Sequence, residues 1–173
     1  FRVTLDRFIR IGSQGQTKAA ANYVGFAAAK NRAAGLGLND ALGVTVDRLG
    51  GLIIGEGTTS NAFFVFGEPQ TGEAKVVTPP LSAGILAGIT RIRVLELAHR
   101  LGYNVKERDV PLDEVALARE IWLTGTASYV APFTHFGRHP LQTEVGRKLN
   151  SYLRDVMAGK YDDLSHLNTE IMV

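Results

Sequence analysis

The chain has 173 residues, a formal net charge of +2 and no cysteine. This length suits one domain with a sizeable core. A hydrophobic share of 45% with 21% charged residues excludes the composition of a disordered chain. The absence of cysteine excludes disulfides, thiolate zinc sites and cysteine nucleophiles, and it fits a cytoplasmic location.

Several classes of partner are not expected. The 19 basic residues are scattered along the chain, so no basic stripe predicts nucleic-acid binding. No run reaches the roughly 20 apolar residues of a membrane span, and the first ten residues lack the apolar core of a signal peptide. The histidines show no paired ligand spacing such as HExxH, so we expect no metal site.

The first half of the chain predicts one helix followed by strands. Residues 19–32 are rich in alanine and contain no proline, which is typical of a helix. Residues 41–46 and 52–55 flank a glycine turn and predict a hairpin, and residues 61–66 predict a further strand of the same sheet. A short strand, KVVT, ends at Pro79, because proline cannot donate to a strand ladder.

The second half alternates helices with strands. The apolar positions of residues 89–101 fit an amphipathic helix that ends at Gly102. The remaining predicted elements are a strand at 103–110, a helix at 111–119, strands at 120–125 and 129–136, and a helix at 145–159. The alternation is too irregular for a Rossmann fold or a TIM barrel, and no GxGxxG or Walker sequence occurs. The fold class is therefore mixed α/β.

Two glycine-flanked turns carry groups that suit an anion. In LAGITR, Gly88 precedes a helix start where Ile89 and Thr90 offer free amides and Thr90 adds a hydroxyl. In LTGTAS, Gly125 and Thr126 end a strand in a turn whose amides suit an anion-binding nest. An ordinary threonine cap and an ordinary turn are the alternatives.

Two charged residues lie at positions that suit a binding or catalytic role. Glu56 follows an apolar strand between glycines, a place where a carboxylate can point into a pocket. Lys18 precedes the small-residue helix, and packing against apolar surface would make its amine a neutral nucleophile. Taken singly, each has the alternative of a solvated surface residue.

These signals follow one another along the chain in the order lysine, tyrosine, glutamate, GITR and GTA. The segments concerned are KAAANY (18–23), EGTTSNAFFV (56–65), TPPLSAGILAGITR (78–91), ERDVPLDE (107–114) and IWLTGTASYVAP (121–132). In this order they resemble the class IV (fold-type IV) aminotransferases that use pyridoxal 5′-phosphate, and most of all the branched-chain amino-acid aminotransferases. The resemblance implies the large cofactor-binding domain of the D-amino-acid aminotransferase-like fold, a mixed sheet or pseudo-barrel with flanking helices.

The resemblance implies a role for each matched residue. Lys18 would form the Schiff base with the cofactor and carry the proton, Tyr23 would face the phenolic oxygen, and Glu56 would pair with the pyridine nitrogen. The other implied cofactor contacts surround the ring and the phosphate: Thr59, Leu86, Gly88, Ile89, Thr90, Gly125 and Thr126. The implied contacts of the substrate carboxylate are Thr126 and Ala127.

The resemblance also implies an activity and an organisation. The activity is transamination between branched-chain L-amino acids and 2-oxo acids, with 2-oxoglutarate as acceptor. Residues 1–173 would form the single large domain of a homodimeric enzyme, and we expect the family's small N-terminal domain, with its phosphate-binding arginine, to lie outside this chain. The alternatives are a D-amino-acid aminotransferase, an amine transaminase, an aminodeoxychorismate lyase, or a non-catalytic cofactor-binding fragment. Ala87 stands where the family often has proline.

Overall fold

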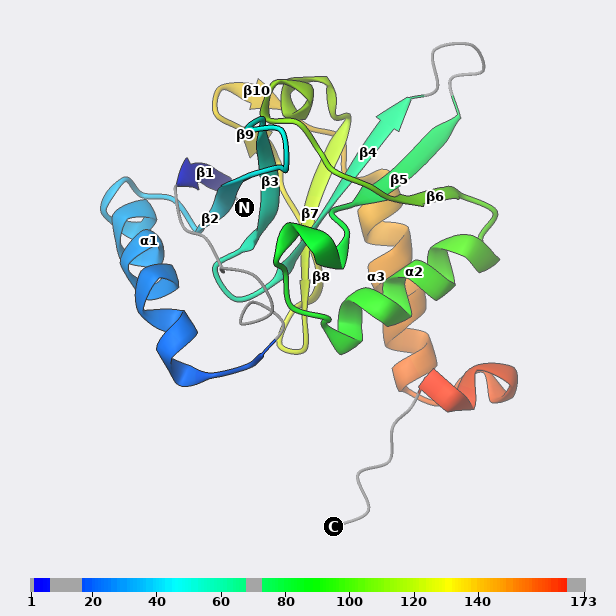
Figure 1. Cartoon of the computed structure of the whole chain (residues 1–173). Coiled ribbons are helices and arrows are strands. Elements are labelled where there is room, and N and C mark those ends of the chain that lie inside the picture. The colour runs from blue at the N-terminus through cyan, green and yellow to red at the C-terminus, as the bar shows by residue number, and fades with distance from the viewer. Residues whose placement is uncertain (1, 7–16, 68–72, 168–173) are drawn as a thin grey trace.

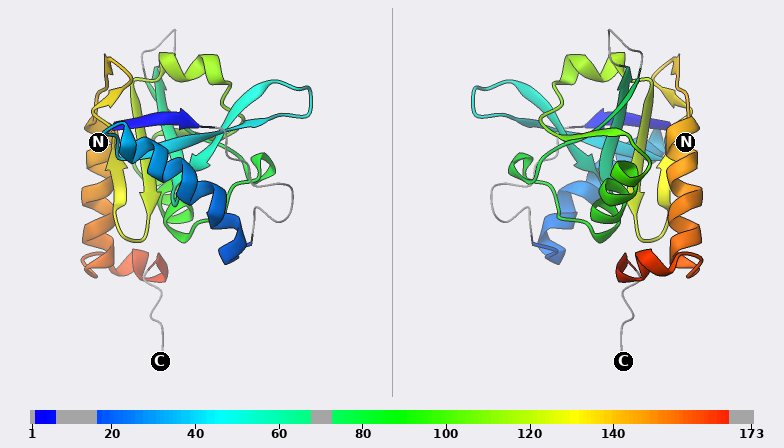
Figure 2. Two further views of the ribbon diagram at one scale, coloured as in Figure 1. Left: turned by 90° about the vertical axis from the view of Figure 1, so that its left-hand side faces the viewer. Right: turned by 90° about the vertical axis from the view of Figure 1, so that its right-hand side faces the viewer.

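Two mixed five-stranded sheets form the centre of the molecule. The computed structural model describes residues 2–6, 17–67 and 73–167. Helix α1 (Tyr23–Gly35) covers the outer face of the first sheet, and α2 (Ile89–Arg100) and α3 (Glu144–Met157) cover the outer face of the second (Figures 1 and 2). The expectation of a mixed α/β fold with flanking helices is confirmed. Within the described ranges, no helix is long and apolar enough to cross a bilayer.

The first sheet has the strand order β10-β9-β1-β2-β3. Its members are β1 (Arg2–Asp6), β2 (Asp40–Val46), β3 (Leu52–Gly57), β9 (His135–Phe136) and β10 (His139–Pro140). Strand β1 runs parallel to both β2 and β9, and the predicted hairpin is confirmed as the antiparallel pair β2–β3. The sequence analysis assigned no element to β1.

The second sheet has the strand order β6-β5-β4-β7-β8. Its members are β4 (Asn61–Gly67), β5 (Ala74–Thr78), β6 (Asn104–Glu107), β7 (Glu120–Gly125) and β8 (Tyr129–Pro132). The expectation that residues 61–66 extend the hairpin sheet is wrong, because β4 pairs with β5 and β7. Phe64 packs toward the first sheet while Phe63 packs toward the helices, so β4 is buried on both faces as a central strand.

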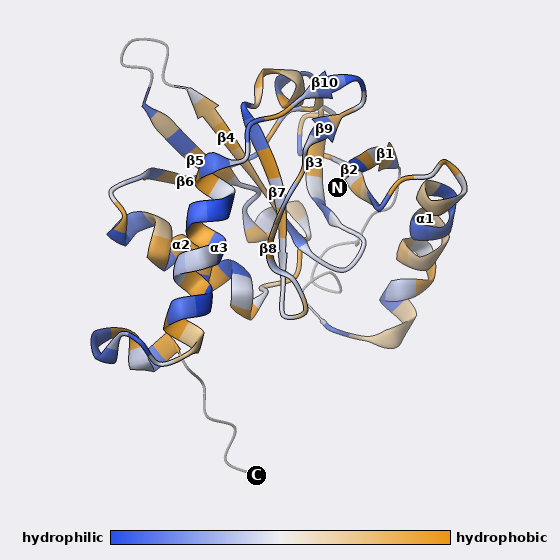
Figure 3. Ribbon diagram, turned by 180° about the vertical axis from the view of Figure 1, so that it is seen from behind, coloured by the Kyte–Doolittle hydropathy of each residue, from blue (hydrophilic) through white to orange (hydrophobic). Residues whose placement is uncertain are grey.

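Three apolar clusters hold these layers together. The first lies between the two sheets and includes Leu42, Ile54 and Phe64. The second joins the second sheet to α2 and α3, and the third packs the alanines of α1 on β2. Figure 3 shows hydrophobic residues concentrated along the central strands, whereas α2 and α3 alternate hydrophobic and hydrophilic stretches. The amphipathic pattern read from the sequence is confirmed for α3, whereas in α2 it is confirmed only from Val94 onward, because Ile89 and Ile92 are exposed.

Four predicted elements change type, are shortened or are divided in the structure. Residues 19–32 begin as a 3-10 turn at Ala20–Asn22 before α1, and residues 111–119 form only a 3-10 helix at Leu112–Leu117. The strand predicted at 103–110 is shortened to β6. The strand predicted at 129–136 is divided between β8 and β9, which belong to different sheets. It is interrupted just after Pro132, a residue that has no N–H to donate to a ladder.

Glu120 begins β7, yet its side chain binds the start of α3. Its two carboxylate oxygens accept hydrogen bonds from the amides of Val145 (2.8 Å) and Gly146 (2.9 Å). These amides belong to the first turn of α3, where backbone N–H groups lack helical acceptors and the helix dipole favours a negative charge. The buried carboxylate therefore fastens α3 to the second sheet.

We expect Glu120→Gln to destabilise the protein, because one of these charged hydrogen bonds is lost and the other becomes neutral. The free energy of unfolding should fall by about 2 kcal/mol. Urea unfolding followed by the fluorescence of Trp122, the single and fully buried tryptophan, measures this change. Asp113→Asn, which removes a negative charge from an exposed position, is the control. Equal unfolding midpoints for the two variants would contradict the role of Glu120.

Candidate functional site

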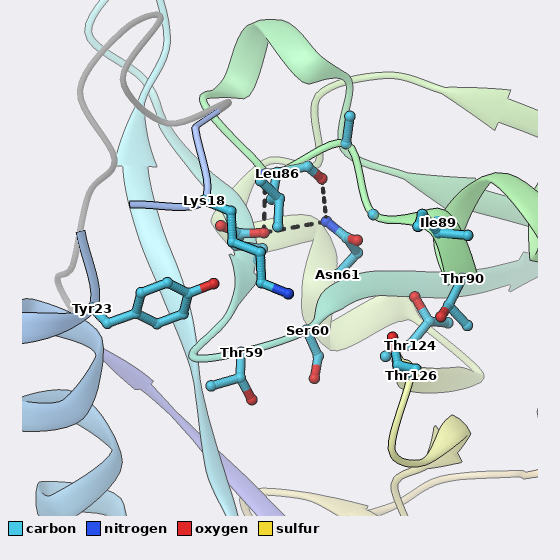
Figure 4. A pocket seen from close by; sticks show the side chains of 14 residues that line it. Lys18, Tyr23, Thr59, Ser60, Asn61, Leu86, Ile89, Thr90, Thr124 and Thr126 are labelled. Carbon is cyan, nitrogen blue, oxygen red and sulfur yellow. Dashed lines mark hydrogen bonds between the residues drawn. The ribbon is translucent and has the colours of Figure 1, made fainter. Parts of the chain in front are cut away.

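A cavity of about 540 Å³ lies where the two sheets meet the starts of α1 and α2. Every residue that the sequence predicts as a cofactor contact lines it, from Lys18 to Thr126. Figure 4 shows these side chains converging from segments that are far apart in the chain. Ala127, predicted as a substrate contact, is exposed in the turn after β7 and is not among the lining residues.

Lys18 and Tyr23 reach the cavity from the segment around the start of α1. Figure 4 shows the Tyr23 hydroxyl pointing toward the Lys18 side chain. Tyr23 is half-buried, and its ring contacts Phe26 at a centroid distance of 6.0 Å. The expectation that close-packed small residues shield Lys18 is wrong, because Lys18 is exposed and so are Ala20 and Ala21. The described part of the chain therefore presents the amine at the cavity without burying it.

A polar chain fixes α1 relative to the end of β3. Asp40, buried at the start of β2, accepts a hydrogen bond from the Thr58 hydroxyl at 2.5 Å. The other oxygen of Asp40 lies 3.3 Å from the Lys30 amine of α1. Thr58 comes two residues after Glu56, so this chain connects the helix that carries Tyr23 with the strand that carries Glu56.

Glu56 lies at the buried end of the cavity. Its side chain is only 5% exposed, although it belongs to a strand of the first sheet. One oxygen, Oε2, accepts hydrogen bonds from Asn61 Nδ2 and from the Leu86 amide, each at 3.2 Å. The interpretation that this carboxylate points into a pocket is confirmed, and the solvated alternative is excluded. A buried carboxylate held this way can receive a cationic or protonated nitrogen.

The other end of the cavity is suited to an anion. Helix α2 begins at Ile89 after Gly88, so the first-turn amides of Ile89 and Thr90 have no helical acceptor. The alternative of a threonine cap is wrong, since the N-cap residue is Gly88 and Thr90 is the second helical residue. In Figure 4, Ile89, Thr90, Thr124 and Thr126 lie together on the side of the cavity away from Tyr23.

The sequence analysis missed four lining residues, Ser60, Asn61, Ala87 and Thr124. Asn61 and Thr124 lie directly opposite each other in the antiparallel pair β4–β7. Both side chains are buried, with 4% and 1% exposure. Asn61 and Thr124 are polar residues at the ends of otherwise apolar strands, and this is the only feature of the sequence that points to them as site residues. Strand pairing is what brings them to one cavity.

The residues present fit a phosphorylated, nitrogen-containing ring. The Thr124 hydroxyl is buried without a hydrogen-bond partner among the described residues, so it has a donor to offer a ligand. Helix amides and further hydroxyls surround it, and a buried carboxylate stands at the opposite end. Within the described ranges, no three histidine, aspartate or glutamate side chains gather as a metal site requires.

Comparisons with known proteins agree with this arrangement. The branched-chain-amino-acid aminotransferase 1, mitochondrial, of Arabidopsis thaliana is 35% identical over 160 residues, which are 88% of this chain and 40% of that protein. The branched-chain aminotransferase of Thermoproteus uzoniensis with norvaline matches at 26% identity and a TM-score of 0.83, over 96% of this chain and 54% of that one. The branched-chain amino acid aminotransferase of Thermobaculum terrenum in its PLP-form matches at 31% identity and a TM-score of 0.82, over 96% and 53%.

A family model identifies the protein family to which the chain belongs. The family model described as amino-transferase class IV covers residues 3–136. The chain spans about half the length of these relatives or less. The match nevertheless includes the second sheet, the first sheet apart from β10 and the first residue of β1, the helices α1 and α2, and every residue that lines the cavity. The chain belongs to the class IV aminotransferase family.

Proposed function

We propose that this chain is the cofactor-binding part of a pyridoxal 5′-phosphate-dependent transaminase of branched-chain L-amino acids, with 2-oxoglutarate as amino-group acceptor. One observation carries the proposal: an amine, a buried carboxylate and a helix N-terminus line a single cavity of about 540 Å³. The relatives are branched-chain aminotransferases, which supports the substrate class, and the PLP-form of the Thermobaculum terrenum enzyme supports the cofactor.

Each end of the cavity would hold a different part of the cofactor. Glu56 would bind the ring nitrogen, and its buried negative charge would keep that nitrogen protonated. Tyr23 would face the phenolic oxygen, and Thr59 would line the ring pocket. Leu86 would pack on the ring. The phosphate would lie at the start of α2 against the following groups: the amides of Ile89 and Thr90, the backbone at Gly88 and Gly125, and the hydroxyls of Thr90, Thr124 and Thr126.

When bound, the cofactor supplies an electron sink for the electron pair left on the substrate's α-carbon. The chain would supply the proton transfer and the orientation. Lys18 Nζ would take the proton from the α-carbon and deliver it to the carbon of the cofactor's aldehyde group, on the other side of the amino nitrogen. The amides of Thr126 and Ala127 would receive the substrate carboxylate, which orients the α-hydrogen toward Lys18. The exposure of Lys18 means that its shielding must come from outside the described residues.

We also propose that the active protein is a cytoplasmic homodimer and that residues 1–173 act together with a small N-terminal domain. None of the described residues lining the cavity is an arginine, which fits a phosphate-binding arginine from that domain. Sedimentation of a longer chain that includes such a domain tests the assembly, and a dimer is the expected result. Titration with the cofactor tests the shared site. The longer chain should bind the cofactor more tightly than residues 1–173 do, and equal binding would contradict the shared site.

The visible absorption of the 173-residue chain with pyridoxal 5′-phosphate tests the function. We expect a bound band that L-leucine converts to the pyridoxamine band and that 2-oxoglutarate then restores. Conversion by a D-amino acid or by a primary amine alone would favour those branches of the family instead. A bound band that no amino donor changes would favour a non-catalytic cofactor-binding fragment. No bound band in either the 173-residue chain or the longer chain with the N-terminal domain would exclude the proposed cofactor.

Thr124 gives a prediction in which stability and binding change in opposite directions. In the apoprotein its hydroxyl is buried without a described partner, so Thr124→Val removes an unsatisfied polar group while nearly keeping the volume. The free energy of unfolding should stay the same or rise by about 1 kcal/mol, whereas the dissociation constant for pyridoxal 5′-phosphate should increase about tenfold. Urea unfolding and absorption titration measure the two quantities. A large loss of stability would show that the hydroxyl has a structural partner.

A further inference from the structure

Asn61 connects the two ends of the cavity through a single amide group. Its Nδ2 donates to Glu56 Oε2 at 3.2 Å and to the Leu86 carbonyl at 2.8 Å. Both bonds are drawn in Figure 4. The first partner belongs to the carboxylate end of the cavity, and the second belongs to the loop that leads into α2. One buried side chain is therefore bonded both to the Glu56 carboxylate and to the loop that precedes α2.

The Leu86 carbonyl links Asn61 to the turn that precedes α2, at the anion end of the cavity. It accepts from Asn61 and also from the Gly88 amide at 2.9 Å, which closes a tight three-residue turn. Gly88 is the N-cap residue of α2. Asn61 therefore holds the turn that sets where the free amides of α2 begin.

The packing around Asn61 is equally specific. A Cβ atom added at Gly88 would overlap Asn61 Oδ1, so the glycine leaves the space that the amide oxygen occupies. The side chain is 4% exposed, and the Leu86 amide donates to the same Glu56 oxygen as Asn61 does. Turning the Glu56 carboxylate or moving the Leu86 turn would break bonds at both places.

We infer that Asn61 is a positioning residue that sets the separation and orientation of the Glu56 carboxylate relative to the N-terminus of α2, so that both ends of pyridoxal 5′-phosphate are bound at once. This inference rests on the proposed function. Hydrogen bonds from Asn61 and Leu86 stabilise the anionic form of Glu56, which is the form that keeps a ring nitrogen protonated. The bond to Leu86 fixes the amides that would receive the phosphate. Asn61 itself acts through these partners.

Asn61→Ala removes both bonds without adding a group that can clash, and Asn61→Ser is the milder second variant. Thr78→Val is the matched control, because the Thr78 hydroxyl donates to the Ala62 carbonyl beside Asn61 and is fully buried, yet it does not line the cavity. Melting of each apoprotein establishes that it is folded. The probes are pyridoxal and pyridoxal 5′-phosphate, titrated by absorption, and cofactor labelled with ¹⁵N in the ring.

We expect Asn61→Ala to raise the dissociation constant of pyridoxal 5′-phosphate about tenfold and that of pyridoxal less. The reason is that the α2 amides, which would bind the phosphate, are no longer held in position relative to Glu56. The ring-nitrogen resonance should move toward its unprotonated position. In a Glu56→Gln background, Asn61→Ala should cause no further movement of that resonance. Asn61→Ser should lie between wild type and Asn61→Ala, and Thr78→Val should change neither readout.

Three other results would overturn the inference in distinguishable ways. If the wild-type chain binds the cofactor with a protonated ring nitrogen, and Asn61→Ala leaves the binding ratio and the resonance unchanged, the positioning role alone is wrong. Equal weakening of both ligands with an unchanged resonance would likewise mean that Asn61 has only a structural role. If neither the 173-residue chain nor the longer chain with the N-terminal domain binds either ligand, the proposed function fails and the inference fails with it.

Discussion

Lys18→Ala is expected to abolish amino-group transfer while the fold remains intact. The amine lies at the cavity with Tyr23, and the described residues that line the cavity include no other lysine or histidine. Without Nζ, nothing at that position can move the α-proton, so the half-reaction with L-leucine should slow by at least about a thousandfold. Because Lys18 is exposed, the unfolding midpoint should not change.

Chemical labelling separates this role from a general effect of charge. Borohydride reduction of the chain with pyridoxal 5′-phosphate should attach the cofactor to the peptide that contains Lys18, and the label should disappear in Lys18→Ala. Lys106→Ala, which removes an exposed lysine from β6, should retain both the label and the rate. A label on any other lysine, or an unchanged rate in Lys18→Ala, would show that the assignment of Lys18 is wrong.

Glu56→Gln is expected to leave the cofactor bound and to slow the half-reaction by two to three orders of magnitude. The volume is kept, and a glutamine oxygen can still accept from Asn61 and Leu86, so the cavity should keep its shape. The negative charge is lost, however, and the ring nitrogen loses the partner that keeps it protonated. The magnitude is about that of losing one preorganised electrostatic partner of a developing charge. Single-turnover absorption with L-leucine measures the rate.

Glu120→Gln is the matched control for this experiment. Glu120 is as deeply buried as Glu56, but its two oxygens bind the start of α3 rather than the cavity. The two variants should therefore give opposite patterns: Glu56→Gln should lose rate and keep stability, and Glu120→Gln should lose stability and keep rate. A rate in Glu56→Gln equal to that of wild type would exclude the electron-sink role of this carboxylate.

Part of the site was predictable because its signals are local in the sequence, whereas Tyr23, Thr59 and Leu86 were implied only by the family resemblance. A glycine before an amphipathic helix already predicts a helix N-terminus, and Gly88 with Ile89 and Thr90 forms one in the structure. Glu56 follows an apolar run at a glycine, and it is buried at the cavity. Exposure of Lys18 was not predictable in this way, because it depends on what packs against α1 in space and not on which residues follow in the chain.

The missed elements depend on partners that are distant in the sequence. Strand β1 has few residues, and it exists because Val3 pairs with Asp40 on one side and Phe136 on the other. Strand β4 is an apolar run without alternation, which shows that a strand is buried on both faces but not which sheet holds it. Asn61 and Thr124 are 63 positions apart in the printed sequence, and only the β4–β7 register sets them opposite each other.

The sequence by itself determined the mixed α/β class, α2 and α3, the β2–β3 hairpin and, with the family resemblance, ten of the fourteen residues that line the cavity. These properties depend on composition, periodicity and short motifs, which are local in the sequence. The tertiary structure alone decided the division into two sheets, the exposure of Lys18 and the amide of Asn61 that joins Glu56 to the Leu86 turn. The physical reason is that burial and hydrogen bonding between distant segments depend on strand pairing, and a linear pattern does not specify which strands pair.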